Sequence, residues 1–294
     1  MDLLNYFLHN ELTSYLVLES LTFEFNVGFL LGCSFLIQII TGFFLACMFV
    51  SESSLAFDSI QFLTRNISYC WYFRFLHING ASILFVLLYL HLFKNMANLT
   101  YKFPRDIVWI FGCMIFIISF LVGFTGYSLV WGQMSYWALT VITNLVTSVP
   151  IVGFEILDWI WGNTVLTSFS LRRFFCIHFL LPFLIIGLIL LHLLLVHRNA
   201  NRLFLDVGVM ISDRVYFIVF LIKDVVLMNL VILIWILFVL SSAVKVFVHP
   251  DNFIYAMVFV TPALLNLNDT SFHSMLFSDL FLINYSEHLV WYSL

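Results

Sequence analysis

Charged side chains are scarce in this sequence, and that scarcity excludes an ordinary soluble domain. Only 10% of the 294 residues are charged, whereas 63% are hydrophobic and the mean hydropathy is +1.07. The formal net charge is −4 and no basic cluster occurs, so nucleic acid is not expected as a partner. This composition indicates a protein that lies largely inside a lipid membrane.

Cysteine is also sparse, and its spacing excludes several kinds of site. The sequence has no Cys-x-x-Cys pair and no Cys-x-x-Cys-His motif. This excludes a cysteine-based zinc site, a redox dithiol and covalently attached haem c. We interpret the five cysteines as small apolar packing residues: Cys33, Cys47, Cys70, Cys113 and Cys176.

Long uncharged stretches predict helices that span the membrane. A helix needs about 20 apolar residues to cross a hydrocarbon layer roughly 30 Å thick. We therefore predict an all-α integral membrane protein with surface helices near 132–162. Its spans are expected at about 26–50, 72–96, 107–129, 173–196 and 219–246.

The predicted spans divide the chain into three regions. The first 25 residues have neither a basic start nor a small-residue cleavage site, and they are expected to form an amphipathic helix on the membrane surface. Residues 26–198 are expected to form a four-helix bundle. Residues 199–294 are expected to hold an inner-side loop, a fifth span and a divergent outer-side tail.

Lysine and arginine indicate the orientation. Segments 94–106 and 197–223, which fall on the side of the N-terminus, together hold most of the 12 Lys and Arg residues. The positive-inside rule places this side in the matrix or cytoplasm. It is called the inner side below.

Four histidines form two pairs with identical spacing. His77 and His91 are 14 residues apart, as are His178 and His192, and each pair lies in an uncharged run. Fourteen helical residues rise about 21 Å and return to within roughly 40° of the same face. Two such helices side by side offer two histidine pairs at two depths of the membrane. This is the ligand set for two haem groups, each held by an imidazole on both sides.

Glycine repeats this spacing on the other two helices of the predicted bundle. Gly28 and Gly42 are 14 residues apart, and so are Gly112 and Gly126. A flat porphyrin needs close approach from helices that do not ligate it, and glycine has no Cβ. Small residues also let membrane helices pack closely without a cofactor, but the shared period favours haem. The pattern predicts a dihaem bundle with ligands on the second and fourth spans.

Two cations lie one helical turn from a histidine. Arg74 precedes His77 by three residues, and Lys94 follows His91 by three. Residues at this spacing share a helix face, so each cation could pair with a haem propionate at the membrane edge. Snorkelling at a helix end is the alternative explanation.

Several segments occur in the order found in one known family. They are Gln-Ile-Ile-Thr-Gly at 38–42, Arg-Phe-Leu-His-Ile-Asn-Gly-Ala-Ser at 74–82, Trp-Gly-Gln-Met-Ser at 131–135, Val-Ile-Thr-Asn-Leu at 141–145, Arg-Phe-Phe-Cys-Ile-His-Phe-Leu-Leu-Pro at 173–182, Lys-Asp at 223–224 and His-Pro-Asp-Asn at 249–252. Over most of residues 20–262 the chain therefore resembles mitochondrial cytochrome b, the family of respiratory complex III (cytochrome bc1).

This resemblance implies two b haems and a role in a multi-subunit enzyme. A low-potential haem would be held near the outer face by His77 and His178, and a high-potential haem near the inner face by His91 and His192. The implied enzyme is ubiquinol:cytochrome c oxidoreductase. It oxidises ubiquinol at an outer site and passes electrons to a Rieske iron–sulfur protein and cytochrome c1. Electrons also reach quinone at an inner site through both haems, with proton translocation.

The resemblance further implies a location, an assembly and quinone-site residues. The protein would be a multi-pass protein of the mitochondrial inner membrane, in a dimeric complex with other complex III subunits. At the inner site His197 and Asp224 would exchange protons with quinone, beside Lys223. At the outer site Phe124, Tyr127 and the segment 131–144 would form an aromatic wall, although the same aromatics could form an interfacial belt.

The resemblance stops near the end of the chain. The family's Pro-Glu-Trp-Tyr motif does not follow Thr261-Pro262, and Val290 stands at the glutamate position of the nearest match. The family's three C-terminal spanning helices are also expected but not found. Either a separate C-terminal fragment completes the protein, or the chain is truncated, or its tail has been replaced.

Three other functions remain open at this stage. One is the dihaem membrane anchor of another quinone-linked oxidoreductase, such as a formate dehydrogenase or hydrogenase. Another is a transporter that uses intramembrane histidines as proton relays. A third is a haem scaffold whose outer site is impaired.

Overall fold

The computed structural model describes residues 16–18, 26–206, 214–240 and 255–256. Within these residues, four helices have the length and apolarity to cross a membrane. They are α2 (Val27–Ala46), α4 (Cys70–Ala97), α5 (Asp106–Ser128) and the part of α8 (Ser168–Asp206) up to His197. These helices coincide with the first four predicted spans, and the prediction of an all-α membrane protein is confirmed.

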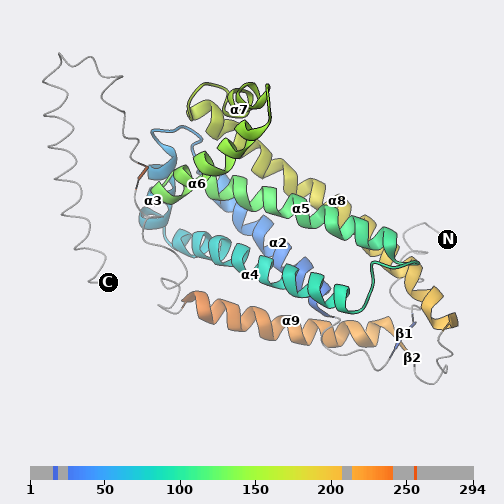
Figure 1. Ribbon diagram of the computed structural model, residues 1–294. Helices are drawn as coiled ribbons and strands as arrows, with labels where there is room; N and C mark the ends of the chain where they lie inside the picture. Colours follow the sequence, from blue (N-terminus) through green and yellow to red (C-terminus); the bar gives the residue numbers. More distant parts are fainter. Residues whose placement is uncertain (1–15, 19–25, 207–213, 241–254, 257–294) are drawn as a thin grey trace, which may run out of the picture. The chain divides into compact units, whose positions relative to one another are not determined.

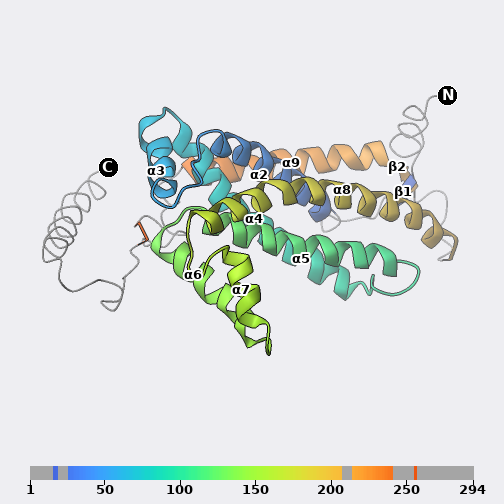
Figure 2. The same ribbon diagram turned by 90° about the horizontal axis from the view of Figure 1, so that it is seen from above.

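The long helices form two packed pairs. α2 packs against α4, and α5 packs against α8. The axes of the four helices are roughly aligned in both views, and the chain direction alternates from one helix to the next (Figures 1 and 2). A fifth long helix, α9 (Phe217–Leu240), packs on α2 and α4 and coincides with most of the fifth predicted span. Residues 241–246 of that span lie outside the described residues.

The helices bury small polar residues and expose large apolar ones. The buried residues of α5 are Ser119, Thr125 and Ser128, whereas Ile117 is 68% exposed. Each of the three buried hydroxyls donates to a carbonyl of its own helix, as Ser119 does to Ile115. Small side chains let helices approach closely in a membrane, where lipid solvates the apolar face. This inside-out pattern is the one expected of a bundle in lipid.

Short helices cover one end of the bundle, which corresponds to the predicted outer side (Figures 1 and 2). They are α3 (Ala56–Asn66), α6 (Gln133–Asn144), the 3₁₀ helix η3 (Leu145–Ser148) and α7 (Gly153–Trp161). α6, η3 and α7 occupy the region where surface helices are predicted, whereas α3 is not predicted. A signal for α3 exists, because its apolar residues recur at helical spacing, with an acid in the first turn and a base in the last.

A buried cluster joins these short helices to the bundle. It contains Ala56, Trp131, Tyr136, Leu139, Leu171, Phe174 and Ala256. The outer end of the bundle is therefore closed by packed side chains from four segments that are distant in sequence.

A polar clamp ties the α2–α3 connection to the start of α8. The Glu52 carboxylate accepts hydrogen bonds from the Ser168 hydroxyl and from the Arg172 guanidinium. The Ser53 and Ser168 hydroxyls lie 2.8 Å apart. The Ser168 hydrogen bond, followed by that from Arg172, lowers the pKa of Glu52 from its ordinary value.

Three local predictions differ from the structure. The first span is expected to reach residue 50, but α2 ends at Ala46. A loop is expected from residue 199, but α8 continues to Asp206 because no proline or glycine interrupts residues 188–206. The predicted N-terminal surface helix is wrong at Leu16–Leu18, which form β1 and pair antiparallel with β2 (Arg214–Tyr216). The rest of that segment lies outside the described residues.

Candidate functional site

Each of the four repeated histidines lies against one of the four repeated glycines. A Cβ added at Gly42 would come within 2.9 Å of His77 Cε1, and one at Gly126 would come closer still to His178 Cε1. A Cβ at Gly28 would lie 3.3 Å from His91 Cε1, and one at Gly112 would lie 3.4 Å from His192 Cε1. At Gly42 and Gly126 only glycine leaves the histidine ring in its present place, whereas a Cβ at Gly28 or Gly112 would displace the ring by at most a few tenths of an ångström.

The contacts define two levels along the bundle. The outer level contains His77, His178, Gly42 and Gly126, and the inner level contains His91, His192, Gly28 and Gly112. Each level combines one histidine and one glycine from the α2–α4 pair with one of each from the α5–α8 pair. The 14-residue period in the sequence therefore becomes two similar layers in space.

The two outer histidines are placed as a pair. Their ring centroids are 6.2 Å apart, and the ring planes are inclined by 84°. Two imidazoles that bind one iron from opposite sides, each through a nitrogen about 2 Å from the metal, would have centroids roughly 6 Å apart. The observed separation fits that arrangement. At the inner level His91 and His192 also lie close enough to interact.

Hydrogen bonds orient the outer rings. His77 Nδ1 lies 3.0 Å from Thr41 Oγ1, and His178 Nδ1 lies 2.9 Å from the Val122 carbonyl oxygen. A backbone oxygen cannot donate, so His178 carries its proton on Nδ1 and its Nε2 is left with a lone pair. This is the state in which a histidine binds iron, with its other ring N–H held by a protein acceptor.

The carbonyl oxygens that contact the histidine rings belong to residues four positions before the repeated glycines. Val122 precedes Gly126 by one helical turn, and the Gln38 carbonyl, which also interacts with His77, precedes Gly42 by one turn. The corresponding carbonyl for His192 is that of Val108. Within the described residues His192 Nδ1 has no partner that meets the distance and angle of a hydrogen bond. Its contact with the Val108 carbonyl is therefore weaker than the hydrogen bonds of the outer histidines.

The two predicted propionate-binding cations occupy different settings. Arg74 is 3% exposed, and its Nη1 donates to Thr64 Oγ1 of α3 at 3.1 Å. Gln61, on the same face of α3, is 7% exposed and has no hydrogen bond to its amide within the described residues. Lys94 lies half-buried in the last turn of α4. The outer cation is thus held by a helix that is missing from the sequence-based prediction.

The aromatic residues predicted for the outer site take part in packing. Phe124 stacks edge-to-face on Phe174 with centroids 6.2 Å apart, whereas Tyr127 is 39% exposed. Trp131 is 3% exposed and contacts Tyr136 edge-to-face at 5.3 Å. Burial raises the pKa of the Tyr136 phenol. These rings form a wall at the outer end, and most of them lie in its packed cluster.

A segment that follows α9 in the sequence is attached to this wall. Tyr255 forms an antiparallel bridge with Gly132, and the Ala256 N–H donates to the Trp131 carbonyl at 3.2 Å. The Tyr255 hydroxyl donates to the Ser53 carbonyl at 3.2 Å. Burial, followed by the charge of Asp58, raises the pKa of Tyr255. This contact cannot be predicted from the sequence, because no local pattern links residues so distant in the chain.

The residues predicted for the inner site lie on two helices. His197 is half-buried near the C-terminal part of α8. In α9, Asp224 is 4% exposed while the neighbouring Lys223 is exposed. Asp224 Oδ1 has no hydrogen-bond partner within the described residues.

A further buried polar residue, Asn26 before α2, is not among the predicted site residues. It is 2% exposed, and neither of its amide atoms is hydrogen-bonded within the described residues.

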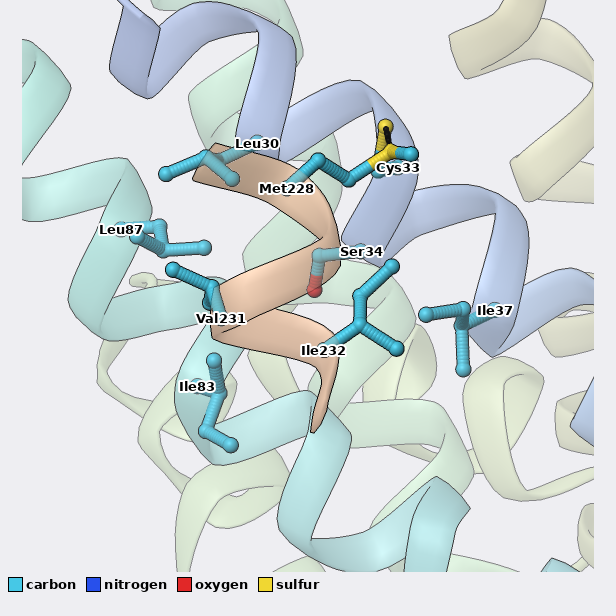
Figure 3. A pocket seen from close by; sticks show the side chains of 9 residues that line it. All are labelled: Leu30, Cys33, Ser34, Ile37, Ile83, Leu87, Met228, Val231 and Ile232. Atoms are coloured by element: carbon cyan, nitrogen blue, oxygen red, sulfur yellow. Dashed lines mark hydrogen bonds between the residues drawn. The ribbon is translucent and has the colours of Figure 1, made fainter. Parts of the chain in front are cut away.

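α2, α4 and α9 enclose a small apolar cavity (Figure 3). The cavity has room for about one water molecule, because the centre of a sphere of that size can occupy ≈ 10 Å³ within it. Ser34, 4% exposed, directs its hydroxyl into this space without a partner among the described residues.

Known proteins are similar to this chain in sequence and in fold. The sequence family described as Cytochrome b/b6/petB matches residues 12–200. Cytochrome b of Chondrus crispus is 38% identical over 255 residues, which are 87% of this chain and 67% of the relative. Cytochrome b of Oryza sativa subsp. japonica is 38% identical over 258 residues, covering 87% of this chain and 64% of the relative.

A solved structure shows the same fold. In a hyperthermophilic respiratory complex III, one chain is 29% identical and superposes with a TM-score of 0.79. The match covers 88% of this chain and 69% of that chain. The chain thus spans about two thirds of the length of these relatives. On the family match and on the identity to curated relatives, this chain belongs to the cytochrome b family.

Proposed function

We propose that this chain is the dihaem, quinol-oxidising subunit of a ubiquinol:cytochrome c oxidoreductase. The observation that carries the proposal is the contact of each repeated glycine with one repeated histidine, at two levels. The same contacts would be unnecessary in a transporter, where a single histidine can relay protons. The residues fit two b haems, a low-potential one with His77 and His178 and a high-potential one with His91 and His192.

The chain's own residues would prepare both haem positions. When bound, the haems supply one-electron transfer across the membrane. His178 presents Nε2 because Val122 holds its Nδ1 proton. The glycines leave space for each histidine ring to lie close to the neighbouring helix. Arg74 and Lys94 lie near the outer and inner ends of α4, where they would bind propionates as cations.

At the inner quinone site, Asp224 and His197 would hold and release the protons that a quinone takes up. Asp224 is buried with an unbonded oxygen, so its carboxyl is available to a ligand. Lys223, the exposed neighbour of Asp224, would add a positive charge close to this site. Asn26, buried at the same end of the bundle, would add an amide donor and acceptor.

At the outer site, Phe124 and Tyr127 would contact the quinol ring and exclude water from it. The family match and the likeness to a chain of a complex III support partners of that complex: a Rieske iron–sulfur protein, cytochrome c1 and other subunits, in a dimer. A separate C-terminal cytochrome b fragment is a further proposed partner, because the match covers about two thirds of the length of the relatives. The four apolar helices and the cytochrome b relatives support a multi-pass location in the mitochondrial inner membrane.

The test is to purify the native complex that contains this chain and to assay quinol-dependent reduction of cytochrome c. We expect such activity, with a Rieske protein and cytochrome c1 present by mass spectrometry. A complex that reduces quinone from another donor and leaves cytochrome c oxidised would contradict the proposal. It would instead support the dihaem anchor of a different oxidoreductase.

A further inference from the structure

The residue before each repeated glycine differs between the two levels. Threonine precedes both outer glycines, as Thr41 and Thr125. Valine and phenylalanine precede the inner ones, at positions 27 and 111. Both threonines are buried, with 2% and 0% of their surface exposed. The outer level therefore has hydroxyl groups next to its histidines, and the inner level has none at these positions.

The Thr41 hydroxyl donates its proton to carbonyl oxygens of its own helix and accepts a hydrogen bond from another direction. It lies 2.7 Å from the Ile37 carbonyl and 3.2 Å from the Gln38 carbonyl, and it donates its single proton to this pair of oxygens. Because that proton is used, the contact of 3.0 Å with His77 Nδ1 must be a bond in which the ring N–H donates. Thr41 thereby places the His77 proton on Nδ1.

We infer that Thr41 is a positioning residue that lowers the reduction potential of the outer haem through His77. The inference rests on the proposed function. An acceptor on Nδ1–H makes the imidazole a stronger donor to iron through Nε2. Stronger donation favours ferric over ferrous iron, and hydrogen bonding beyond the ligands is one of the means by which proteins set haem potentials. Thr41 thus contributes to the difference in potential between two sites with the same ligand set.

Thr125 provides an internal control, because it has the same type, burial and position beside a glycine. Its hydroxyl donates to the Leu121 carbonyl at 2.8 Å and to the Val122 carbonyl at 3.1 Å. The same Val122 oxygen accepts from His178 Nδ1 at 2.9 Å. Thr41 likewise shares the Gln38 carbonyl with His77, so the two threonines differ in one contact. Among the described residues Thr41 Oγ1 also lies within hydrogen-bond distance of a histidine nitrogen, whereas Thr125 contacts only the carbonyls. Removal of the Thr125 hydroxyl would leave the Val122 carbonyl free to bond His178 more strongly.

The test is a spectroscopic redox titration of the full complex carrying Thr41→Val or Thr125→Val. Thr41→Val should shift the outer haem toward the reduced state, by about threefold to tenfold in its reduction equilibrium. Tenfold is 59 mV for a one-electron couple. Thr41→Ser, which keeps the hydroxyl, should restore the original potential. Thr125→Val should leave the potential unchanged or lower it slightly, and the inner haem should not change in any variant.

Two further variants guard against a failure of Thr41→Val to assemble. Thr41→Ala removes the hydroxyl without adding bulk, and Thr41→Cys keeps a weak acceptor, so it should give a smaller rise. An unchanged outer potential in every assembled variant without the hydroxyl would overturn the inference, as would equal shifts for Thr41→Val and Thr125→Val. If the unaltered complex contains no b haem, the proposed function fails, and this outcome is distinct from an unchanged potential.

Discussion

The outer and inner levels of the bundle use the same residue types but support them differently. At the outer level both histidines have hydrogen bonds of 3.0 and 2.9 Å to Nδ1. At the inner level His192 Nδ1 has no such bond within the described residues. The glycine contacts follow the same order, since an added Cβ would clash more severely at the outer level. The outer level is thus the more rigidly prepared of the two.

The two ends of the bundle also differ in the packing and in the polar groups that surround each level. The outer end is closed by a packed cluster that joins α3, α6 and α8, and by the clamp at Glu52. Toward the inner end, Asn26 and Asp224 are buried with side-chain atoms that have no partner among the described residues. Unbonded buried polar groups are costly, and a ligand that exchanges protons would satisfy them. Gln61 at the outer end is also buried without a hydrogen bond among these residues. The two ends therefore differ in the packed cluster and the Glu52 clamp of the outer end, and in the buried carboxyl of Asp224 toward the inner end.

Loss of a histidine should produce the largest effect and should separate the levels. His178→Leu removes one of the two outer imidazoles, and we expect the outer haem to be lost. His192→Leu should remove the inner haem by the same reasoning. Low-temperature optical spectra of the purified complexes would identify which absorption band disappears. Loss of both bands in either variant, in a complex that still assembles, would show that the levels are not separate sites.

Glycine substitutions should show the difference in tightness. Gly126→Ala places a Cβ against the His178 ring, so we expect most of the outer haem to be lost. Gly112→Ala requires a shift of only a few tenths of an ångström at His192, so most of the inner haem should remain. Haem content per chain, measured from the pyridine haemochrome, would check both.

Gly187→Ala is the matched control for these substitutions. Nothing lies within 4 Å of the Cβ that would be added there, and alanine favours a helix over glycine by roughly 0.5–1 kcal/mol. Haem content should be unchanged. Equal losses in Gly126→Ala and Gly112→Ala would contradict the view that the outer level is the tighter one.

Asp224→Asn should affect the inner end alone. The amide keeps the shape of the side chain but cannot exchange a proton, and groups in that role accelerate reactions by roughly 10²–10⁴-fold. Quinone reduction at the inner site should slow by about 100-fold, while reduction of the outer haem by quinol stays normal. Lys223→Gln, one residue away and exposed, should have a much smaller effect. Stopped-flow absorbance of the two haems would follow both reactions, and similar effects of the two variants would count against a role for Asp224 in proton exchange.

The smallest effect should come from acid at the Glu52 clamp. Because the folded pKa of Glu52 is lowered, the clamp adds stability above the unfolded pKa of about 4.5. That contribution is lost as the pH falls through the lower folded value. Thermal unfolding followed between pH 6 and pH 3 should lose part of its pH dependence in Glu52→Gln. An identical dependence in the variant would show that the clamp does not stabilise the outer end.

Much of this arrangement could be predicted from the sequence, because it follows from periods and composition. The 14-residue spacing of His77 and His91 repeats on a second helix, and helical geometry then requires two levels. The spans follow from the lack of charge. α3 is amphipathic but carries Asp58 and Arg65, so a lack of charge does not mark it as a helix.

Contacts between distant residues could not be predicted in this way. The bond between His77 and Thr41 depends on how α2 and α4 pack, and no local pattern specifies a ring orientation. A hint exists, since threonine precedes the glycine at both outer positions. The pairing of Tyr255 with Gly132, and of Leu16 with Tyr216, likewise depends on chain segments that meet only in the fold.

The central claim is that two histidine pairs hold two separate b haems in one chain. A redox titration of the native complex, monitored in the b-haem absorption bands and normalised to the amount of this chain, tests it most directly. The account predicts two b haems per chain with resolvable midpoint potentials, the lower belonging to the band that disappears in His178→Leu. A single haem per chain, or none, would contradict it.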